Sequence, residues 1–242
     1  MYSAFTQHGF KYKFEFGVEG AKTIAEPDSV AVIVDVLSFT TCIDIATSHG
    51  AEIVPYGKNR KGAATLADKL GATVSGERGT ARFSLSPETM EKARKGQIII
   101  LRSINGAELT IAALKHYDTV IGACLRNSAA VAEFVKKLRP ETVAVIAAGE
   151  KWPSGELRPA FEDLIGAGAV LANFERGMLS PEAKMTVDAF KSVKDLRREL
   201  RNCESGRELI QKGYDRDIRL AGMLNASKSV PVVIGGRYRN KD

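Results

Sequence analysis

Cysteine is scarce in this chain, and the spacings that bind metal through cysteine or histidine are missing. The three cysteines, Cys42, Cys124 and Cys203, are far apart, and none belongs to a C-x-x-C motif or a cysteine–histidine pattern. A disulfide framework or a structural zinc site would need such paired or closely spaced ligands. We therefore predict three free thiols, no disulfide and no structural zinc.

Long hydrophobic runs are also missing. No window approaches the roughly 20 apolar residues that a membrane-spanning helix needs. The first twenty residues carry Lys11, Lys13, Glu15 and Glu19, and they lack an apolar stretch followed by a small-residue cleavage site. The sequence predicts a cytoplasmic protein without a membrane partner.

The familiar signatures of phosphate chemistry are absent as well. Neither a P-loop nor a G-x-G-x-x-G motif occurs. Asp35 is not followed by the second aspartate of the D-x-D phosphatases, and Ala130 stands where a cysteine phosphatase built on Cys124 would need arginine. No R-H-G phosphohistidine signature is found either. Any phosphate chemistry must therefore use another arrangement.

The basic residues outnumber the acidic ones, with a formal net charge of +6, but they are spread along the chain. The densest segment, residues 194–201, alternates Lys and Arg with Asp and Glu, which is typical of a solvated helix face. No interleaving of basic and aromatic residues supports a nucleic-acid interface. The charge favours a small anionic ligand, and no nucleic-acid partner is expected.

Short apolar runs alternate with segments of helical length and spacing from Val30 onward. Such near-continuous apolar strands are covered on both faces, and repeated βαβ units place them in a largely parallel sheet. The predicted strands are Val30–Val34, Glu52–Pro55, Gln97–Leu101, Thr119–Ala123 and Thr142–Ala147, and the predicted helices are Thr40–His49, Gly106–His116 and Asn127–Leu138. We predict a three-layer α/β/α fold with a mostly parallel, mixed-edge sheet, forming a single domain over residues 1–242.

The two ends of the chain differ from this pattern. Phe10–Phe16 alternates strictly, which predicts an edge strand with one wet face. After Ala169 the chain is mostly helical, with starts expected at Ser180-Pro181 and around Ser205-Gly206-Arg207. Val230–Ile234 is expected to form a last short strand that rejoins the sheet.

Polar residues follow each predicted strand, where an α/β sheet binds its ligands. Hydroxyls, amides, arginines and carboxylates are therefore expected to converge as an anion pocket. Those after successive strands are Asp35, Ser38 and Thr40, then Arg102, Asn105 and Gly106, then Arg126 and Asn127, then Glu150 and Arg158. Capping of the following helix is the competing interpretation for each hydroxyl or amide. Asp35 is the strongest candidate, because a carboxylate at the end of a buried strand needs a cation, a metal or several donors.

Two further segments carry paired charges. Residues 147–171 run from a strand through a charged loop into a helix whose first turn holds the adjacent acids Glu162 and Asp163. Adjacent acids on a helix face different ways, so we expect only one to point at a given ligand, and Gly166 and Gly168 to allow close packing. In the other segment, Glu77 and Arg78 lie between Gly76 and Gly79, which would let the backbone approach a substrate.

The chain resembles the 2-phosphosulfolactate phosphatase family, of the ComB type, from Val30 to Ile234. The resemblance lies in the order of ten short motifs. They are VIVDVLSFTT (Val32–Thr41), HGAEIVPY (His49–Tyr56), GERG (Gly76–Gly79), SLSP (Ser84–Pro87), NG (Asn105-Gly106), LRNSAAVA (Leu125–Ala132), AAGE (Ala147–Glu150), LRPAFEDLIGAGAV (Leu157–Val170), SGRELI (Ser205–Ile210) and LNASKSVPVV (Leu224–Val233).

This resemblance implies a Mg²⁺-dependent phosphoric monoester hydrolase that converts 2-phospho-3-sulfolactate to 3-sulfolactate, as in coenzyme M biosynthesis. Mg²⁺ prefers oxygen ligands, so one or two carboxylates suffice to bind it. The implied partner is a small anionic phosphorylated substrate, and a homo-oligomer is left open. The implied roles are catalysis for Asp35, Glu77 and Glu162, metal binding for Asp35 and Asp163, and substrate binding for Ser38, Thr40, Arg78, Asn105, Gly106, Arg126, Asn127 and Arg158.

The chain departs from the family pattern in three places. Ser38-Phe39 replaces an arginine-alanine pair, Phe83–Pro87 lacks an aspartate, and Arg102-Ser103-Ile104 replaces a threonine-rich segment. Two alternatives therefore stay open: a phosphatase of another small phosphorylated hydroxy acid, and a non-catalytic anion-binding member of the family. Carboxylate attack on phosphorus and carboxylate-directed attack by water are also both open.

Overall fold

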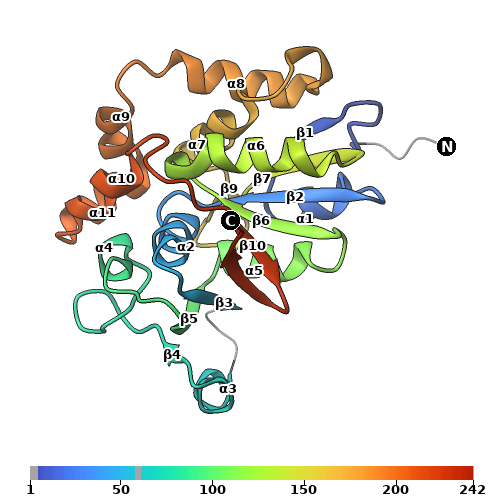
Figure 1. The fold of residues 1–242 in the computed structure, drawn as a ribbon. Coiled ribbons are helices and arrows are strands. Elements are labelled where there is room, and N and C mark those ends of the chain that lie inside the picture. The colour runs from blue at the N-terminus through green and yellow to red at the C-terminus, as the bar shows by residue number, and fades with distance from the viewer. Residues whose placement is uncertain (1–4, 58–60, 242) are drawn as a thin grey trace.

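A nine-stranded mixed sheet runs through this computed structural model, which describes residues 5–57 and 61–241 (Figure 1). One parallel block consists of β1 (Tyr12–Phe16), β7 (Thr142–Ala147), β2 (Ser29–Val34) and β6 (Thr119–Ala123), in that spatial order. The other parallel block consists of β3 (Glu52–Gly57), β5 (Ile98–Ser103) and β4 (Thr73–Val74). The α/β fold with a mostly parallel sheet is confirmed.

An antiparallel hairpin joins the two blocks in the middle of the sheet. Its strands are β10 (Pro231–Ile234), which pairs with β6, and β11 (Arg237–Asn240), which pairs with β3. Gly235 and Gly236 form the turn, and both have positive φ, as a two-residue hairpin turn requires. The predicted last strand therefore rejoins the sheet, but its antiparallel pairing lies at the centre rather than at an edge.

Helices cover both faces of the first block because alternate residues of β2 are apolar on both sides. Val30, Val32 and Val34 pack against α6 (Ser128–Leu138), α7 (Phe161–Leu171) and α8 (Pro181–Ser192). Ala31 and Ile33 pack on the other face, against α1 (Gly17–Thr23) and α5 (Gly106–Ala113). Figure 1 shows these layers on either side of the strands. This arrangement leaves the strand ends available for a site.

The second block is smaller and is covered by other helices. The helix α2 (Phe39–Ser48) packs on β3 and β5 together with α4 (Pro87–Met90), and α3 (Ala63–Leu70) covers the opposite face. The C-terminal helices α9 (Leu196–Asn202), α10 (Glu204–Gln211) and α11 (Asp215–Ala221) pack on one another, and α11 lies beside α4 (Figure 1). Short 3₁₀ turns occupy Leu125–Asn127 and Arg176–Met178.

The first strand lies at the sheet edge as predicted, but it has no wet face. Tyr12, Lys13 and Phe14 are all buried. The Lys13 ammonium is accommodated because it donates to the Thr6 carbonyl at 2.9 Å and pairs with Glu26 at 2.8 Å. The alternation of FKYKFEF thus correctly predicted a strand, but the predicted solvent-exposed face was wrong.

The other element predictions agree with the structure to within a few residues. The strands β6 and β7 have the predicted bounds, and α8 begins at Pro181 with the Ser180 hydroxyl accepting from the Ala183 amide. The helix α10 begins at Glu204, so Ser205 and Gly206 lie inside it. All three cysteines are free thiols.

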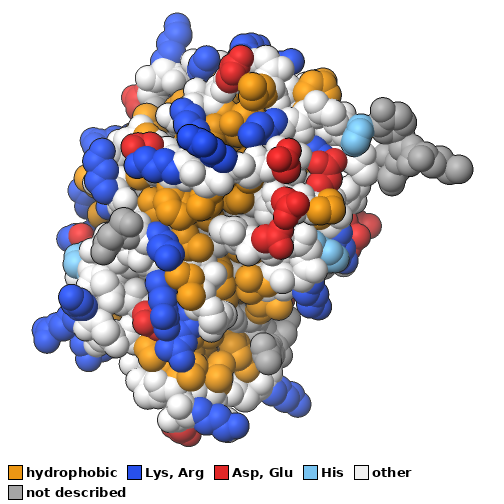
Figure 2. All heavy atoms as spheres, turned by 45° about the vertical axis from the view of Figure 1, so that its right-hand side comes forward, with side chains coloured by type: hydrophobic (Ala, Val, Ile, Leu, Met, Phe, Trp, Pro, Cys, Tyr) orange, Lys and Arg blue, Asp and Glu red, His pale blue; other side chains and the backbone are white. Residues whose placement is uncertain are grey.

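The surface carries dispersed positive charge. On the face in Figure 2, lysine and arginine side chains lie at many separate places among hydrophobic and acidic ones. Over the described residues, the helices are all too short or too polar to cross a bilayer.

Candidate active site

A cavity of about 590 Å³ opens where the loops after β2, β4, β5 and β7 meet, and its volume is in the range of small-molecule sites. Seven of the residues that the sequence placed in the site line it: Asp35, Ser38, Glu77, Arg78, Arg102, Asn105 and Glu150. The C-terminal helix α10 and the residues that follow it form another wall. Loops that are far apart in the sequence therefore line one cavity, as we predicted from the polar residues that follow the strands.

Asp35 lies in the wall of this cavity with both carboxylate oxygens held by backbone amides. Oδ1 accepts from the Phe39 N–H at 3.0 Å, and Oδ2 accepts from the Gly106 N–H at 3.0 Å. Thr40 lies behind it, where its hydroxyl donates to the Asp35 carbonyl at 2.7 Å and accepts from the Asp35 amide at 2.9 Å. Thr40 and Gly106 thus contact Asp35 itself rather than the cavity.

Asp163 and Glu162, in the first turn of α7, lie behind the cavity. The Asp163 carboxylate accepts from the amides of Val36 at 2.7 Å and Gly149 at 2.8 Å, so it connects the segments that follow β2 and β7. Both acids are buried, at 3% and 2% exposure. Neither residue is among those that line the cavity. The two adjacent acids contact different groups, as predicted, because Glu162 faces the Cys203 thiol. Burial, with Glu162 as the second cause, raises the pKa of that thiol to about 12.

Glu150, directly after β7, lines the cavity, and the sequence assigned it no catalytic role. Its Oε2 accepts from the Asn105 side-chain amide at 2.8 Å. It begins a short hairpin of β8 (Glu150–Lys151) and β9 (Leu157–Arg158) at the mouth of the site. The sequence placed it in the anion pocket, three residues after the end of a buried strand, without assigning it a proton-transfer role.

The acids Asp35, Glu150, Glu162 and Asp163 form a cluster in which the charge of one raises the pKa of another. Burial, reinforced by Glu162, raises the pKa of Asp35 to about 6 despite its two amide donors. Burial and the charge of Asp35 raise the pKa of Glu150 to about 7. Burial raises the pKa of Asp163 well above its usual range, with Asp35 and Glu162 adding to it. Such shifted carboxyl groups in a cavity are typical of functional sites.

Arg78 brings positive charge to the same cavity. One terminal nitrogen donates to the Ser38 hydroxyl at 3.0 Å, and the other pairs with Asp217 of α11. The guanidinium lies 5.3 Å from the centre of the Tyr214 ring. Glu77, its neighbour in the loop, is exposed at the cavity rim.

Arg158 lies in a second cavity of about 490 Å³, next to the first. Its guanidinium stacks 5.7 Å from the centre of the exposed Trp152 ring. Glu150, Ser205 and Glu208 belong to the walls of both cavities. Arg158 is therefore close to the main cavity without lining it.

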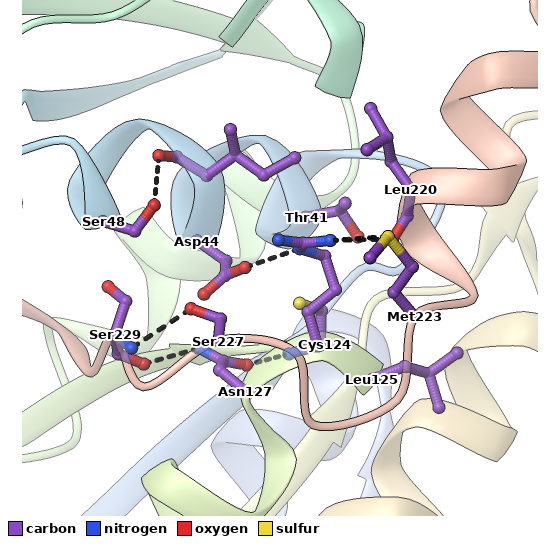
Figure 3. A network of polar contacts seen from close by, with 12 residues as sticks. Thr41, Asp44, Ser48, Cys124, Leu125, Asn127, Leu220, Met223, Ser227 and Ser229 are labelled. Atoms are coloured by element: carbon purple, nitrogen blue, oxygen red, sulfur yellow. Dashed lines mark hydrogen bonds and ion pairs between the residues drawn. The ribbon is translucent and has the colours of Figure 1, made fainter. Parts of the chain in front are cut away.

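Arg126 and Asn127 are not brought to the cavity. They belong to a separate network, where the Arg126 Nε pairs with the buried Asp44 at 2.8 Å. Figure 3 shows Asn127 of this network, which accepts from the Cys124 amide and donates to the Ser229 carbonyl. The reason is that the segment after α11 crosses this strand end. The amides of Asn225 and Ser227 donate to the carbonyls of Leu125 and Arg126 at 3.0 and 2.9 Å.

This crossing segment also takes over the capping role expected of Asn127. The Asn225 side-chain oxygen accepts from the Ala129 amide at 3.0 Å and the Ser128 hydroxyl at 2.8 Å. Asn127 is instead fully buried, and its oxygen accepts from the Cys124 amide at 2.8 Å.

Sequence reasoning overlooked the contribution of the C-terminal helices. Ser205, Glu208 and Lys212 line the main cavity, and Lys212 adds a third cation beside Arg78 and the predicted Arg102. Helical residues far from any strand end carry no local signal of a site, so only the fold could bring them there.

The geometry agrees with a comparison of the sequence with known families. The model of the 2-phosphosulfolactate phosphatase family matches residues 18–236, which is nearly the whole chain. The chain belongs to this family. The predicted resemblance is thereby confirmed, and it extends through the C-terminal helices that close the cavity.

Relatives match along most of their length. A probable 2-phosphosulfolactate phosphatase of Carboxydothermus hydrogenoformans is 32% identical over 84% of this chain and 86% of its own. Proteins with the same name from Parasynechococcus marenigrum and Thermotoga petrophila are 31% and 28% identical, over 86% and 88% of this chain and 89% and 92% of theirs.

Proposed function

We propose that this member of the family is a phosphatase that hydrolyses 2-phospho-3-sulfolactate to 3-sulfolactate and phosphate in the cytoplasm, as in coenzyme M biosynthesis. The observation that carries the proposal is the buried Asp35 carboxylate in a cavity that also holds Arg78, Arg102 and Lys212. A substrate with three acidic groups needs several cations and hydroxyl donors, and this cavity provides both. The names of the relatives support the same activity.

Different residues of the cavity would bind the substrate, donate a proton and activate the nucleophile in phosphate ester hydrolysis. Arg78 and Ser38 would bind anionic oxygens, since an arginine fork and a hydroxyl both donate hydrogen bonds. Glu150 holds a proton near neutral pH, because its pKa is raised to about 7, so it can donate that proton to the leaving oxygen of the hydroxy acid. Asp35 would then direct a water molecule at phosphorus or attack phosphorus itself.

Magnesium fits the donor chemistry of the acidic cluster. The cluster offers only oxygen donors, and its repelling charges raise three pKa values, as expected where a cation belongs. Across residues 5–57 and 61–241, no three Asp, Glu, His or Cys side chains form a ready-made metal group. Mg²⁺ often uses only one or two carboxylates with waters. We propose Asp35 as its carboxylate ligand, with waters, because Asp163, the other predicted ligand, holds two amides away from the cavity and Glu150 keeps its proton for the leaving oxygen. The ion would neutralise charge on the phosphoryl oxygens.

Phosphate release tests the activity. We expect release from 2-phospho-3-sulfolactate with Mg²⁺, loss of release in EDTA, and a fall of at least about 100-fold in kcat for Asp35→Asn. Asp68→Asn, at an exposed position of α3, is the matched control and should behave as wild type. Release that continues in EDTA would contradict the metal requirement, and an active Asp35→Asn would contradict the role of Asp35.

A panel of other phosphorylated hydroxy acids tests the substrate. The second cavity beside the first leaves room for a larger acid than sulfolactate. Faster hydrolysis of another member of the panel would make that compound the proposed substrate and would leave the phosphatase activity unchanged. No release from any substrate would favour a non-catalytic anion-binding protein.

A further inference from the structure

Asp217 connects the C-terminal helix α11 to two other segments, the start of α4 and the loop that carries Arg78. Its side chain is 1% exposed. Oδ1 accepts from the Ser86 hydroxyl at 2.7 Å and from the Glu88 amide at 3.0 Å, while Oδ2 pairs with the Arg78 guanidinium. A buried carboxylate with these partners is fully compensated, so it needs no ligand of its own.

The contacts of Arg78 show what this carboxylate does for the cavity. The guanidinium is held by Asp217 through one terminal nitrogen and donates to the Ser38 hydroxyl at 3.0 Å through the other. The Tyr214 ring, 5.3 Å away, supports its face. A free arginine on a glycine-flanked loop would lose rotamer entropy on binding an anion. Here folding has already restricted the side chain.

We propose that Asp217 is a positioning residue, which acts through Arg78 to hold the anion-binding guanidinium in the orientation that the substrate needs. The inference rests on the proposed function, in which Arg78 binds an anionic oxygen of the substrate. It makes the turn between α10 and α11 part of the active site, with Asp217 and Tyr214 on two sides of the same guanidinium.

Asp217→Asn separates the positioning role from the structural one. The amide oxygen of asparagine can still accept from the Ser86 hydroxyl and the Glu88 amide. The amide NH₂, however, takes the place of the oxygen that holds Arg78, and two donors then face each other. Arg78 is thus released while the other two contacts remain.

The test is a double-mutant cycle of Asp217→Asn and Arg78→Ala, with KM and kcat for phosphate release and the Kd of inorganic phosphate by calorimetry. We expect Asp217→Asn alone to raise KM and the phosphate Kd about tenfold, as for loss of a hydrogen bond to a charged group, with a smaller change in kcat. In the Arg78→Ala background the same substitution should change neither constant. Additive effects in the two backgrounds would overturn the proposal, because a merely structural defect does not depend on Arg78.

Ser86→Ala is the matched control, since it removes a donor to the same carboxylate but leaves the Arg78 contact. It should lower the melting temperature and leave KM unchanged. If Asp217→Asn does not fold, Tyr214→Leu carries the test. It should raise KM in the wild-type background and have no effect beside Arg78→Ala, and a KM effect of the same size in both backgrounds would refute the positioning role.

The phosphate titration distinguishes two hypotheses: that Arg78 binds the anion, and that Asp217 positions Arg78. An Arg78→Ala enzyme with unchanged KM and phosphate Kd would remove Arg78 from the proposed site. A raised Kd for Arg78→Ala with an unchanged Kd for Asp217→Asn would retain the site and reject the inference. Since the titration needs no turnover, it remains decisive for Asp217 even if phosphosulfolactate is not hydrolysed.

Discussion

At the scale of single residues, the site depends on how closely the backbone approaches Asp35. The Gly106 amide donates to Asp35 Oδ2, and a Cβ atom at position 106 would lie 2.6 Å from that oxygen and 2.3 Å from the Phe39 ring. Glycine is therefore required here for space rather than for turn geometry. The sequence could place Asp35 and Gly106 after two strands, but it could not show that they touch.

Gly106→Ala tests this close approach. The added methyl group should displace Phe39 or Asp35 and lower the free energy of unfolding by about 1–3 kcal/mol, as other overpacking substitutions do. Phosphate release should fall with it, because Asp35 loses an amide donor. Urea unfolding and the phosphatase assay are the measurements. Gly177→Ala, where the nearest atom is 3.8 Å away, is the control and should change neither.

Arg126 was predicted to bind substrate, but in the structure it pairs with the buried Asp44. Its partner Asp44 is fully buried, so Arg126→Gln should leave a carboxylate uncompensated and cost about 3–5 kcal/mol. KM of the folded enzyme should equal that of wild type. A raised KM with unchanged stability would instead support the substrate-binding role predicted from the sequence.

At the scale of elements, the helix α7 uses two glycines for close packing, as their spacing in the sequence predicted. Gly166 faces Val34 and Val36 of the β2 region, and Gly168 faces α8, as their predicted role in close packing required. The first turn of the same helix supplies Asp163, whose two carboxylate oxygens accept from backbone amides of the segments after β2 and β7. One helix thus packs against both the sheet and α8, and it aligns two strand ends of the site.

Gly168→Ala tests the helix pair. A Cβ atom there would lie 2.4 Å from the Thr186 carbonyl oxygen and 2.7 Å from the Phe190 Cβ, so α7 and α8 would have to separate. We expect a loss of about 1–3 kcal/mol in stability. No residue of α7 lines the cavity, so kcat should change less than stability. Thermal unfolding by calorimetry, compared with kcat below the transition, measures both.

At the scale of the whole molecule, the buried acids make stability depend on pH. The folded pKa values of Asp35 and Glu150, about 6 and about 7, exceed their ordinary values of 3.8 and 4.5. The folded state therefore binds more protons than the unfolded state between about pH 4 and pH 7. The stabilising contribution of these groups is complete at the acidic end of this window and is lost as the pH rises through it.

Urea unfolding in EDTA across this range should show falling stability with rising pH. Glu150→Gln removes one of the two groups and should flatten the curve in its upper half, whereas Asp68→Asn should not. A stability that rises through the window would contradict the raised pKa values. Added Mg²⁺ should reduce the loss at high pH if it binds the ionised cluster, because a ligand that binds only the folded state stabilises it.

The sequence by itself determined the class of the fold, most strands of the parallel blocks and the family, because these depend on local periodicity and on the order of short motifs. It also identified Asp35, Ser38, Arg78 and Asn105 as residues near strand ends, where parallel sheets bind ligands. Only the tertiary structure decided the rest. The C-terminal chain crosses the end of β6 and covers Arg126 and Asn127. From far along the sequence, α10 and its end bring Ser205 and Lys212 to the cavity, and α11 brings Asp217 to Arg78. Those contacts depend on long-range packing, which no local pattern of residues encodes.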